Sequence, residues 1–119
     1  MKSTDYKDLV VWQKSVDLAI WVYEMTRTFP KEEIYGITSQ MRRAAVSVSS
    51  NIAEGQSRQH RAEFIQFLYI AKGSLAELET QLIIAKKLDY LAEESALAGT
   101  SRLAEVHRLL VPLIRKLKT

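Results

Sequence analysis

The segment from Ile37 to Gly55 is the part of the chain that most restricts how it can fold. At about 100° per residue, its apolar side chains fall within one narrow arc of a helical wheel. These residues are Ile37, Met41, Ala44, Ala45, Val48 and Ile52. Gln40, Ser47 and Asn51 border the arc, and serine and asparagine are weak helix formers because their side chains compete for backbone hydrogen bonds. We therefore predict a helix over residues 37–55 that neighbouring helices stabilise and that Gly55 ends in a left-handed conformation.

Three other segments have the same spacing of apolar residues, and we predict helices over residues 8–28, 59–88 and 93–117. The connections between the four helices are short, which makes consecutive helices antiparallel. The sequence therefore predicts an all-α fold, an antiparallel up-down-up-down four-helix bundle, with residues 1–119 as a single domain. Gly73 interrupts the third helix, and because glycine weakens a helix interior we expect two helices to approach closely there.

The first predicted helix is apolar on two opposite sides. We assign one side to the core of the bundle; its residues are Leu9, Trp12, Val16, Ala19, Ile20 and Tyr23. A helix in so small a bundle cannot bury both sides within one subunit. We therefore predict that the other side forms the interface of a homo-oligomer; its residues are Val11, Leu18, Val22 and Met25.

Composition excludes several classes of protein and of site. The chain has no cysteine, so it has neither disulfides nor thiolate metal sites. It has no apolar run of the roughly 18 residues that a membrane span needs and no apolar signal sequence, so we predict a cytoplasmic protein without membrane contact. The sequence also lacks a glycine-rich phosphate loop, an HExxH motif and Glu-x-x-His pairs. We predict no metal, no cofactor and no catalytic residue.

The net charge of +3 is unevenly distributed along the chain. Residues 37–72 contain five basic and two acidic residues, whereas residues 1–36 and 73–119 are each within one charge of neutral. We predict that the basic residues here form one continuous nucleic-acid-binding surface, because cations pair with phosphates and bases stack on an interleaved aromatic residue, here Tyr69. The candidates are Arg42, Arg43, Arg58, Arg61 and Lys72. The alternative is a purely structural or protein-interaction bundle, in which these side chains serve solubility alone.

One spacing points instead to catalysis. Arg102 and His107 form an Arg-x4-His pattern in the fourth predicted helix, which resembles the active motif of HEPN ribonucleases, a family of helical bundles. In that family the arginine binds phosphate and the histidine acts in acid–base cleavage. With two histidines and eight arginines in the chain, one such spacing arises readily by chance. A ribonuclease is therefore a second alternative to the nucleic-acid-binding module.

Three segments together resemble a known family: DLVVWQKSVDLA, then TSQMRRAAVSV with NIAEG after it, and then AKGSLAELE. They are similar to the four-helix-bundle proteins encoded in 23S rRNA intervening sequences, a family that includes the accessory variability determinant of diversity-generating retroelements. The structural positions of the matching motifs are Gln40, Ser47, Asn51, Glu54, Gly55, Gly73, Ser74 and Glu77. The matching basic positions are Arg42, Arg43 and Lys72.

The resemblance implies a four-helix bundle that assembles as a homopentamer and has no known enzymatic activity. It also implies that a basic surface binds RNA or other nucleic acid, and, for the retroelement proteins, that a reverse transcriptase or another nucleoprotein is a partner. It supplies no catalytic residue. On these grounds we expect a non-enzymatic, oligomeric module that binds nucleic acid.

Overall fold

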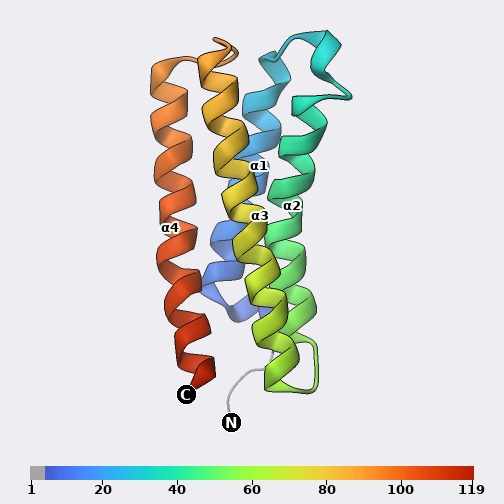
Figure 1. Cartoon of the computed structure of the whole chain (residues 1–119), viewed down its shortest axis with the longest axis vertical. Coiled ribbons are helices and arrows are strands. Elements are labelled where there is room, and N and C mark those ends of the chain that lie inside the picture. The colour runs from blue at the N-terminus through green and yellow to red at the C-terminus, as the bar shows by residue number, and fades with distance from the viewer. Residues whose placement is uncertain (1–4) are drawn as a thin grey trace.

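The computed structural model describes residues 5–119, which form four α-helices and three short 3₁₀-helices. The α-helices are α1 (Val10–Met25), α2 (Ile37–Gln56), α3 (Arg61–Lys87) and α4 (Glu93–Lys118). The 3₁₀-helices are η1 (Tyr6–Asp8), η2 (Thr26–Thr28) and η3 (Lys31–Glu33). Each α-helix runs antiparallel to the one before it (Figure 1), and residues 5–119 contain no strand. The predicted all-α, up-down-up-down four-helix bundle is confirmed.

The four helices form a square in cross-section. Both α1 and α3 pack against α2 and against α4, and the α2–α3 contact is the most extensive. The α1–α2 and α3–α4 seams therefore lie on opposite sides of the bundle, which is 48 Å long. The C-terminal end of α4 and the α2–α3 turn lie at one end, and the α3–α4 turn lies at the other (Figure 1).

Apolar side chains from all four helices fill the centre of the bundle. The largest fully buried side chains include Leu18, Met41, Ile52, Leu68, Leu78 and Leu110. Each such side chain stabilises the fold by about 1.5–3 kcal/mol through burial. The apolar arc predicted for residues 37–55 is buried from Met41 to Ile52, so this helix packs as expected.

The structure corrects the prediction for α1. The bundle core contains the side chains that we assigned to an oligomer interface, namely Val11, Leu18, Val22 and Met25. The first three are at most 5% exposed and Met25 is half-buried, so the predicted interface is wrong. Ile20 and Tyr23, which we assigned to the core, are 52% and 43% exposed. Both sides of α1 are apolar, and therefore periodicity alone does not tell which side faces inward.

Gly55 lies inside α2 rather than at a left-handed end. The helix continues to Gln56, and none of the glycines has a positive φ, so the predicted left-handed conformation is wrong. A Cβ atom at Gly55 would lie 2.7 Å from Cβ of Phe67 and 2.9 Å from Cδ1 of Phe64. The glycine is therefore needed because α3 approaches α2 closely at this point.

Gly73 does not mark a close approach between helices. It is exposed, and no atom lies within 4 Å of a Cβ built there, so that prediction is also wrong. The second close contact is instead at Gly99 in α4, where a Cβ would lie 2.6 Å from Cη2 of Trp21. Close packing of helices thus occurs at Gly55 and Gly99.

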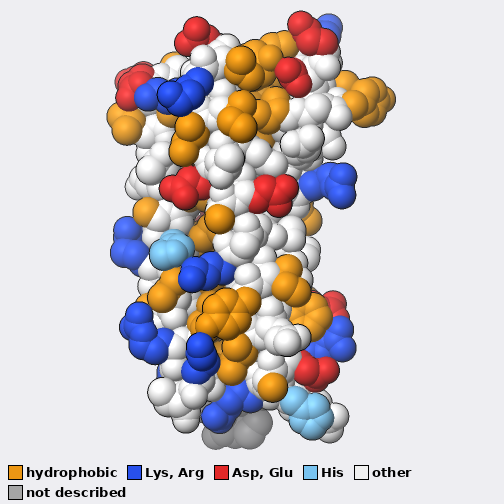
Figure 2. All heavy atoms as spheres, in the orientation of Figure 1, with side chains coloured by type: hydrophobic (Ala, Val, Ile, Leu, Met, Phe, Trp, Pro, Cys, Tyr) orange, Lys and Arg blue, Asp and Glu red, His pale blue; other side chains and the backbone are white. Residues whose placement is uncertain are grey.

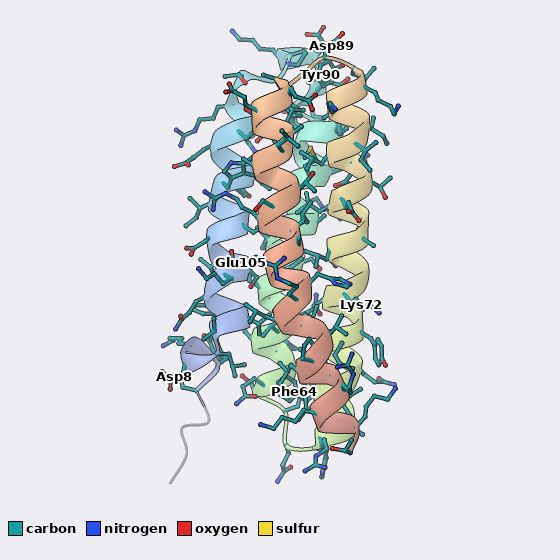
Figure 3. The ribbon with its side chains drawn as sticks, turned by 90° about the vertical axis from the view of Figure 1, so that its left-hand side faces the viewer. Asp8, Phe64, Lys72, Asp89, Tyr90 and Glu105 are labelled. Carbon is teal, nitrogen blue, oxygen red and sulfur yellow. The ribbon has the colours of Figure 1, made fainter. Side chains whose placement is uncertain are left out.

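The α3–α4 turn is closed by backbone hydrogen bonds. Asp89 adopts a left-handed φ of 61°, and the amides of Asp89 and Tyr90 donate to the carbonyl oxygens of Lys86 and Ala85, each at 2.9 Å. This pattern ends α3 in a Schellman motif. The hydroxyl of Tyr90 donates to Oε2 of Glu33 at 2.8 Å and ties the turn to η3 (Figure 3 labels Tyr90 and Asp89).

Candidate nucleic-acid interface

The five basic residues predicted to form one surface lie on different sides of the bundle. Arg42 is at the α1–α2 seam, where its Nε donates to Oγ1 of Thr26 at 2.9 Å and its guanidinium lies 4.8 Å from the ring centroid of Tyr23. Lys72 is at the α3–α4 seam, beside α4 (Figure 3). Because these two seams are on opposite sides, the prediction of one continuous surface is wrong.

Of the other three predicted cations, Arg61 alone shares a side with Lys72. The two are eleven residues apart on α3, a separation that brings side chains to the same face of a helix. Arg58, in the α2–α3 turn, forms a 2.7 Å ion pair with Glu54, which offsets its charge. Arg43 is exposed on α2. The predicted set therefore places two cations, Arg61 and Lys72, on one face.

A groove runs along the α3–α4 seam and contains two adjoining cavities of about 350 and 320 Å³, both lined by Lys72. Polar and basic side chains stand on its two walls, and we define the α3–α4 groove by Tyr69, Lys72, His107, Arg108, Arg115 and Lys118. Val111 and Ile114 form an apolar floor in the second cavity. Among the described residues, no Asp or Glu lines the second cavity, whereas Glu79 lines the first.

The positive charge of this groove comes mainly from the second half of α4. Residues 106–119 contain four basic residues and no acidic one, whereas residues 73–105 contain three basic and six acidic residues. A count over residues 73–119 hides this contrast, because the two parts nearly cancel. Figure 2 shows Lys and Arg side chains gathered over the lower part of α4 and the adjoining part of α3, with acidic side chains toward the upper end and the α2 edge.

Tyr69 stands among these cations and is 43% exposed. Nζ of Lys118 donates to its hydroxyl at 3.0 Å and lies 5.5 Å from the ring centroid. If Nζ were above the ring at this distance from the hydroxyl, it would be closer to the centroid than 5.5 Å. The amino group of Lys118 therefore lies beyond the hydroxyl, at the edge of the ring. The hydrogen bond from Lys118, together with the positive charges of Lys118 and Lys72, lowers the pKa of Tyr69 below its usual 10.0. The groove thus combines positive potential with an aromatic face that Lys118 leaves uncovered.

The family model of the 23S rRNA-intervening sequence protein matches residues 7–112. The chain belongs to this family. A crystal structure of a protein of unknown function from the S23 ribosomal protein family, from Bacteroides thetaiotaomicron, shares the fold with a TM-score of 0.84. It is 28% identical, and the match covers 92% of this chain and 98% of that one. Comparison with curated proteins gives no significant match. The resemblance that the sequence motifs carry is therefore confirmed.

Several residues of the motifs that resemble the 23S rRNA-intervening sequence family build the α2–α3 contact. Nδ2 of Asn51 donates to the backbone oxygen and the hydroxyl of Ser47, at 2.8 and 2.9 Å. The hydroxyl of Ser47 is in turn 2.8 Å from the hydroxyl of Ser74 on α3. Asn51 therefore bonds within its own helix, and Ser47 provides the link between the two helices. Together with Gly55, these residues hold α2 and α3 close to each other.

The remaining structural positions of these motifs lie at the surface. Gln40 and Glu77 line a shallow hollow between α2 and α3. Glu54 pairs with the arginine at the α2–α3 turn, and Gly73 is exposed. None of these side chains lines the α3–α4 groove, but four other residues of the motif AKGSLAELE do, namely Lys72, Leu75, Ala76 and Glu79.

Arg102 and His107 do not converge on one site. Five residues of α-helix correspond to a rotation of about 140°, and of the two only His107 lines the α3–α4 groove. Within residues 5–119, no group of three or more His, Asp or Glu side chains is placed to hold a metal ion. None of the helices in the described part of the chain has the length and apolar character that a membrane crossing requires.

Proposed function

We propose that this protein is a non-enzymatic module that binds nucleic acid through the α3–α4 groove. The observation that carries the proposal is the set of cations facing each other across the groove, Lys72 on α3 and Arg115 and Lys118 on α4, with no acidic side chain among the described residues of the second cavity. Phosphates of a nucleic acid backbone pair with such cations and release counterions, which is the main source of affinity in sequence-independent binding.

Stabilisation of the helix end explains only part of this charge. Cations in the last turn of a helix interact favourably with its dipole, and Arg115 and Lys118 are in the last turn of α4. The effect is confined to the last turn, however. Lys72 is in the middle of α3 and Arg108 is ten residues before the end of α4, so neither has this role. The groove thus contains more positive charge than helix capping uses.

We further propose that the module acts as a homo-oligomer, with the pentamer that the family resemblance implies as the expected state. Ile20 and Tyr23 on α1 and Val46 on α2 are apolar or aromatic side chains that are at least 40% exposed. None of these three side chains lines the α3–α4 groove, so contacts made there leave much of the groove open. Grooves repeated around a ring bind one nucleic acid with added strength through multivalency. The nucleic acid is RNA or DNA, either free or within a nucleoprotein such as a reverse transcriptase complex.

Two charge-reversal variants of equal net charge test the location of the site. Lys72→Glu/Arg115→Glu changes the groove, and Arg43→Glu/Arg102→Glu changes two cations that do not line it. Each variant lowers the formal net charge from +3 to −1, because two reversals remove four charges. A difference between them therefore reports the position of the charges and not their sum.

The measurement is fluorescence anisotropy with labelled RNA and DNA at about 50 and 200 mM salt. Four phosphate contacts, from Lys72, Arg108, Arg115 and Lys118, give a salt slope of about −3 to −4, so the fourfold rise in salt weakens binding by about 50- to 150-fold. The groove variant halves the slope, whereas the control variant keeps it. Light scattering on the same samples gives the mass of the particle that binds.

The other outcomes separate the alternatives. Absence of binding to RNA and DNA in low salt contradicts the proposal and favours the protein-interaction bundle. Equal loss of affinity in both double variants contradicts the assignment to the groove. Cleavage of the labelled RNA that His107→Ala abolishes favours the ribonuclease. A mass near 14 kDa contradicts the homo-oligomer.

A further inference from the structure

We infer that the α3–α4 groove takes single-stranded nucleic acid, with phosphates on the cations of both walls and one base stacked on the ring of Tyr69. This inference rests on the proposed function and adds to it the class of nucleic acid. It follows from the mixed surface of the groove, from the uncovered face of Tyr69 and from the position of Glu79.

The groove places charged and apolar surface side by side. Lys72, Arg115 and Lys118 supply cations at the walls, and Tyr69 and half-buried Val111 present aromatic and apolar surface between them. A double helix turns its phosphates outward and keeps its bases stacked inside, so it satisfies the walls and leaves the floor uncovered. A single strand presents a phosphate and an unstacked base at each nucleotide. It therefore satisfies both kinds of surface at once.

Tyr69 has the features of a stacking platform. The hydrogen bond from Lys118, at 3.0 Å, holds the ring at its edge, so Lys118 does not cover the face of a side chain that is 43% exposed. Stacking of this kind tolerates any sequence, because every base has a π face. Tyr35, in the connection between η3 and α2, is 95% exposed and lines neither cavity of the groove. The chain thus contains an exposed tyrosine outside the groove, which serves as a control.

Glu79 limits the binding region on one side. It lies seven residues after Lys72 on α3 and lines the first cavity, where its carboxylate repels phosphate. In the other direction Arg61 lies eight residues before Tyr69, about 12 Å along the axis of α3, and shares the side of Lys72. The bound strand therefore extends from Lys72 toward the α2–α3 turn and not toward the α3–α4 turn.

The test compares three labelled probes by anisotropy: an oligouridine and an oligothymidine, each of about 12 nucleotides, and a duplex of the same length. The first two also distinguish RNA from DNA. Tyr69→Leu removes the stacking face, and we expect it to weaken binding of the single strands by about 5- to 100-fold. Tyr69→Phe keeps the face and should change the affinity by less than about threefold. Tyr35→Leu is the control and should leave the affinity unchanged, because Tyr35 is 95% exposed and lines neither cavity of the groove.

Cross-linking gives a measurement that needs no variant to fold. Oligouridine that contains 4-thiouridine, irradiated on the unmodified protein, should cross-link to the tryptic peptide of residues 62–72, which contains Tyr69. Equal affinity for duplex and single strand, with no loss in Tyr69→Leu and no cross-link in this peptide, overturns the inference. In that case the proposed function stands if Lys72→Glu/Arg115→Glu still weakens binding. Absence of binding to all three probes overturns both.

Discussion

Gly55→Ala and Gly73→Ala add the same methyl group to two helical positions, yet the structure predicts opposite effects on the free energy of unfolding. At Gly73 no atom lies within 4 Å of the added Cβ. At Gly55 the Cβ would lie 2.7 Å from Cβ of Phe67, 2.9 Å from Cδ1 of Phe64 and 3.2 Å from the backbone oxygen of Phe64. The ring of Phe64 can rotate, but the other two atoms can move only if the backbone of α3 moves away from α2.

The magnitude follows from two opposing terms. Alanine is favoured over glycine inside a helix by about 1 kcal/mol, so Gly73→Ala should stabilise the protein by about that amount. Gly55 is one residue from the end of α2, so its gain is smaller. Overpacking there costs about 1–3 kcal/mol. We therefore expect Gly55→Ala to be about 2 kcal/mol less stable than Gly73→Ala. For a domain of this size that difference corresponds to roughly 8 °C in Tm.

Thermal melts followed by circular dichroism check this prediction, with denaturant titration as a second measure of the free energy of unfolding. All samples should have the same protein concentration, because assembly makes the apparent stability depend on concentration. If Gly55→Ala stabilises the protein as much as Gly73→Ala, the close α2–α3 approach at Gly55 does not exist. If Gly73→Ala destabilises it, the open environment of Gly73 is wrong.

Two further predictions concern hydrogen bonds. Asn51→Ala removes the two bonds to Ser47 and should lower the free energy of unfolding by about 1 kcal/mol in a denaturant titration, whereas Ser50→Ala on the exposed side of α2 should lower it by less than about 0.5 kcal/mol. An equal decrease in the free energy of unfolding for the two variants would show that the hydrogen bonds of Asn51 do not stabilise the fold. The bond from Tyr90 to Glu33 raises the pKa of Tyr90 above 10.0, so the stabilisation is complete below pH 10.0 and is lost as the pH rises through the higher folded-state pKa. Tyr90→Phe should therefore melt below the parent protein at neutral pH, and the gap should close above pH 10.0; a gap that stays constant with pH would refute this role.

The sequence was sufficient to predict the helices because each carries a long periodic stripe. Residues 37–55 were predicted as one helix, and α2 spans Ile37–Gln56. The first helix was harder, because two opposite sides of α1 are apolar and helical spacing does not tell which one faces the core. The exposure of Gly73 could have been predicted from the sequence. Gly73 lies about 200° around the helix from Ala71. Because Ala71 is buried, Gly73 lies outside the buried stripe.

The candidate site was only partly predictable. Lys72 and Tyr69 were identified, because both are in the segment with the largest excess of positive charge. Arg108, Arg115 and Lys118 were missed, since the acidic first half of α4 offsets them in any count over the whole C-terminal third. Their meeting with Lys72 depends on α4 packing beside α3, which periodicity within one helix cannot show. Counting the charge of each half of the helix separately would have shown that the second half of α4 is basic. It would not have shown that α4 packs beside α3.

The two sides of α3 make different contacts, and the family motifs include the α3 side of the groove but not its α4 side. Toward α2, the Ser47–Ser74 hydroxyl pair and Gly55 keep the helices in close contact. Toward α4, the seam opens into cavities of about 350 and 320 Å³. The motif AKGSLAELE serves both sides, because Ser74 faces α2 whereas Lys72, Leu75, Ala76 and Glu79 line the groove toward α4. The cations of α4 lie outside those motifs, so matching the motifs alone does not identify the proposed binding site.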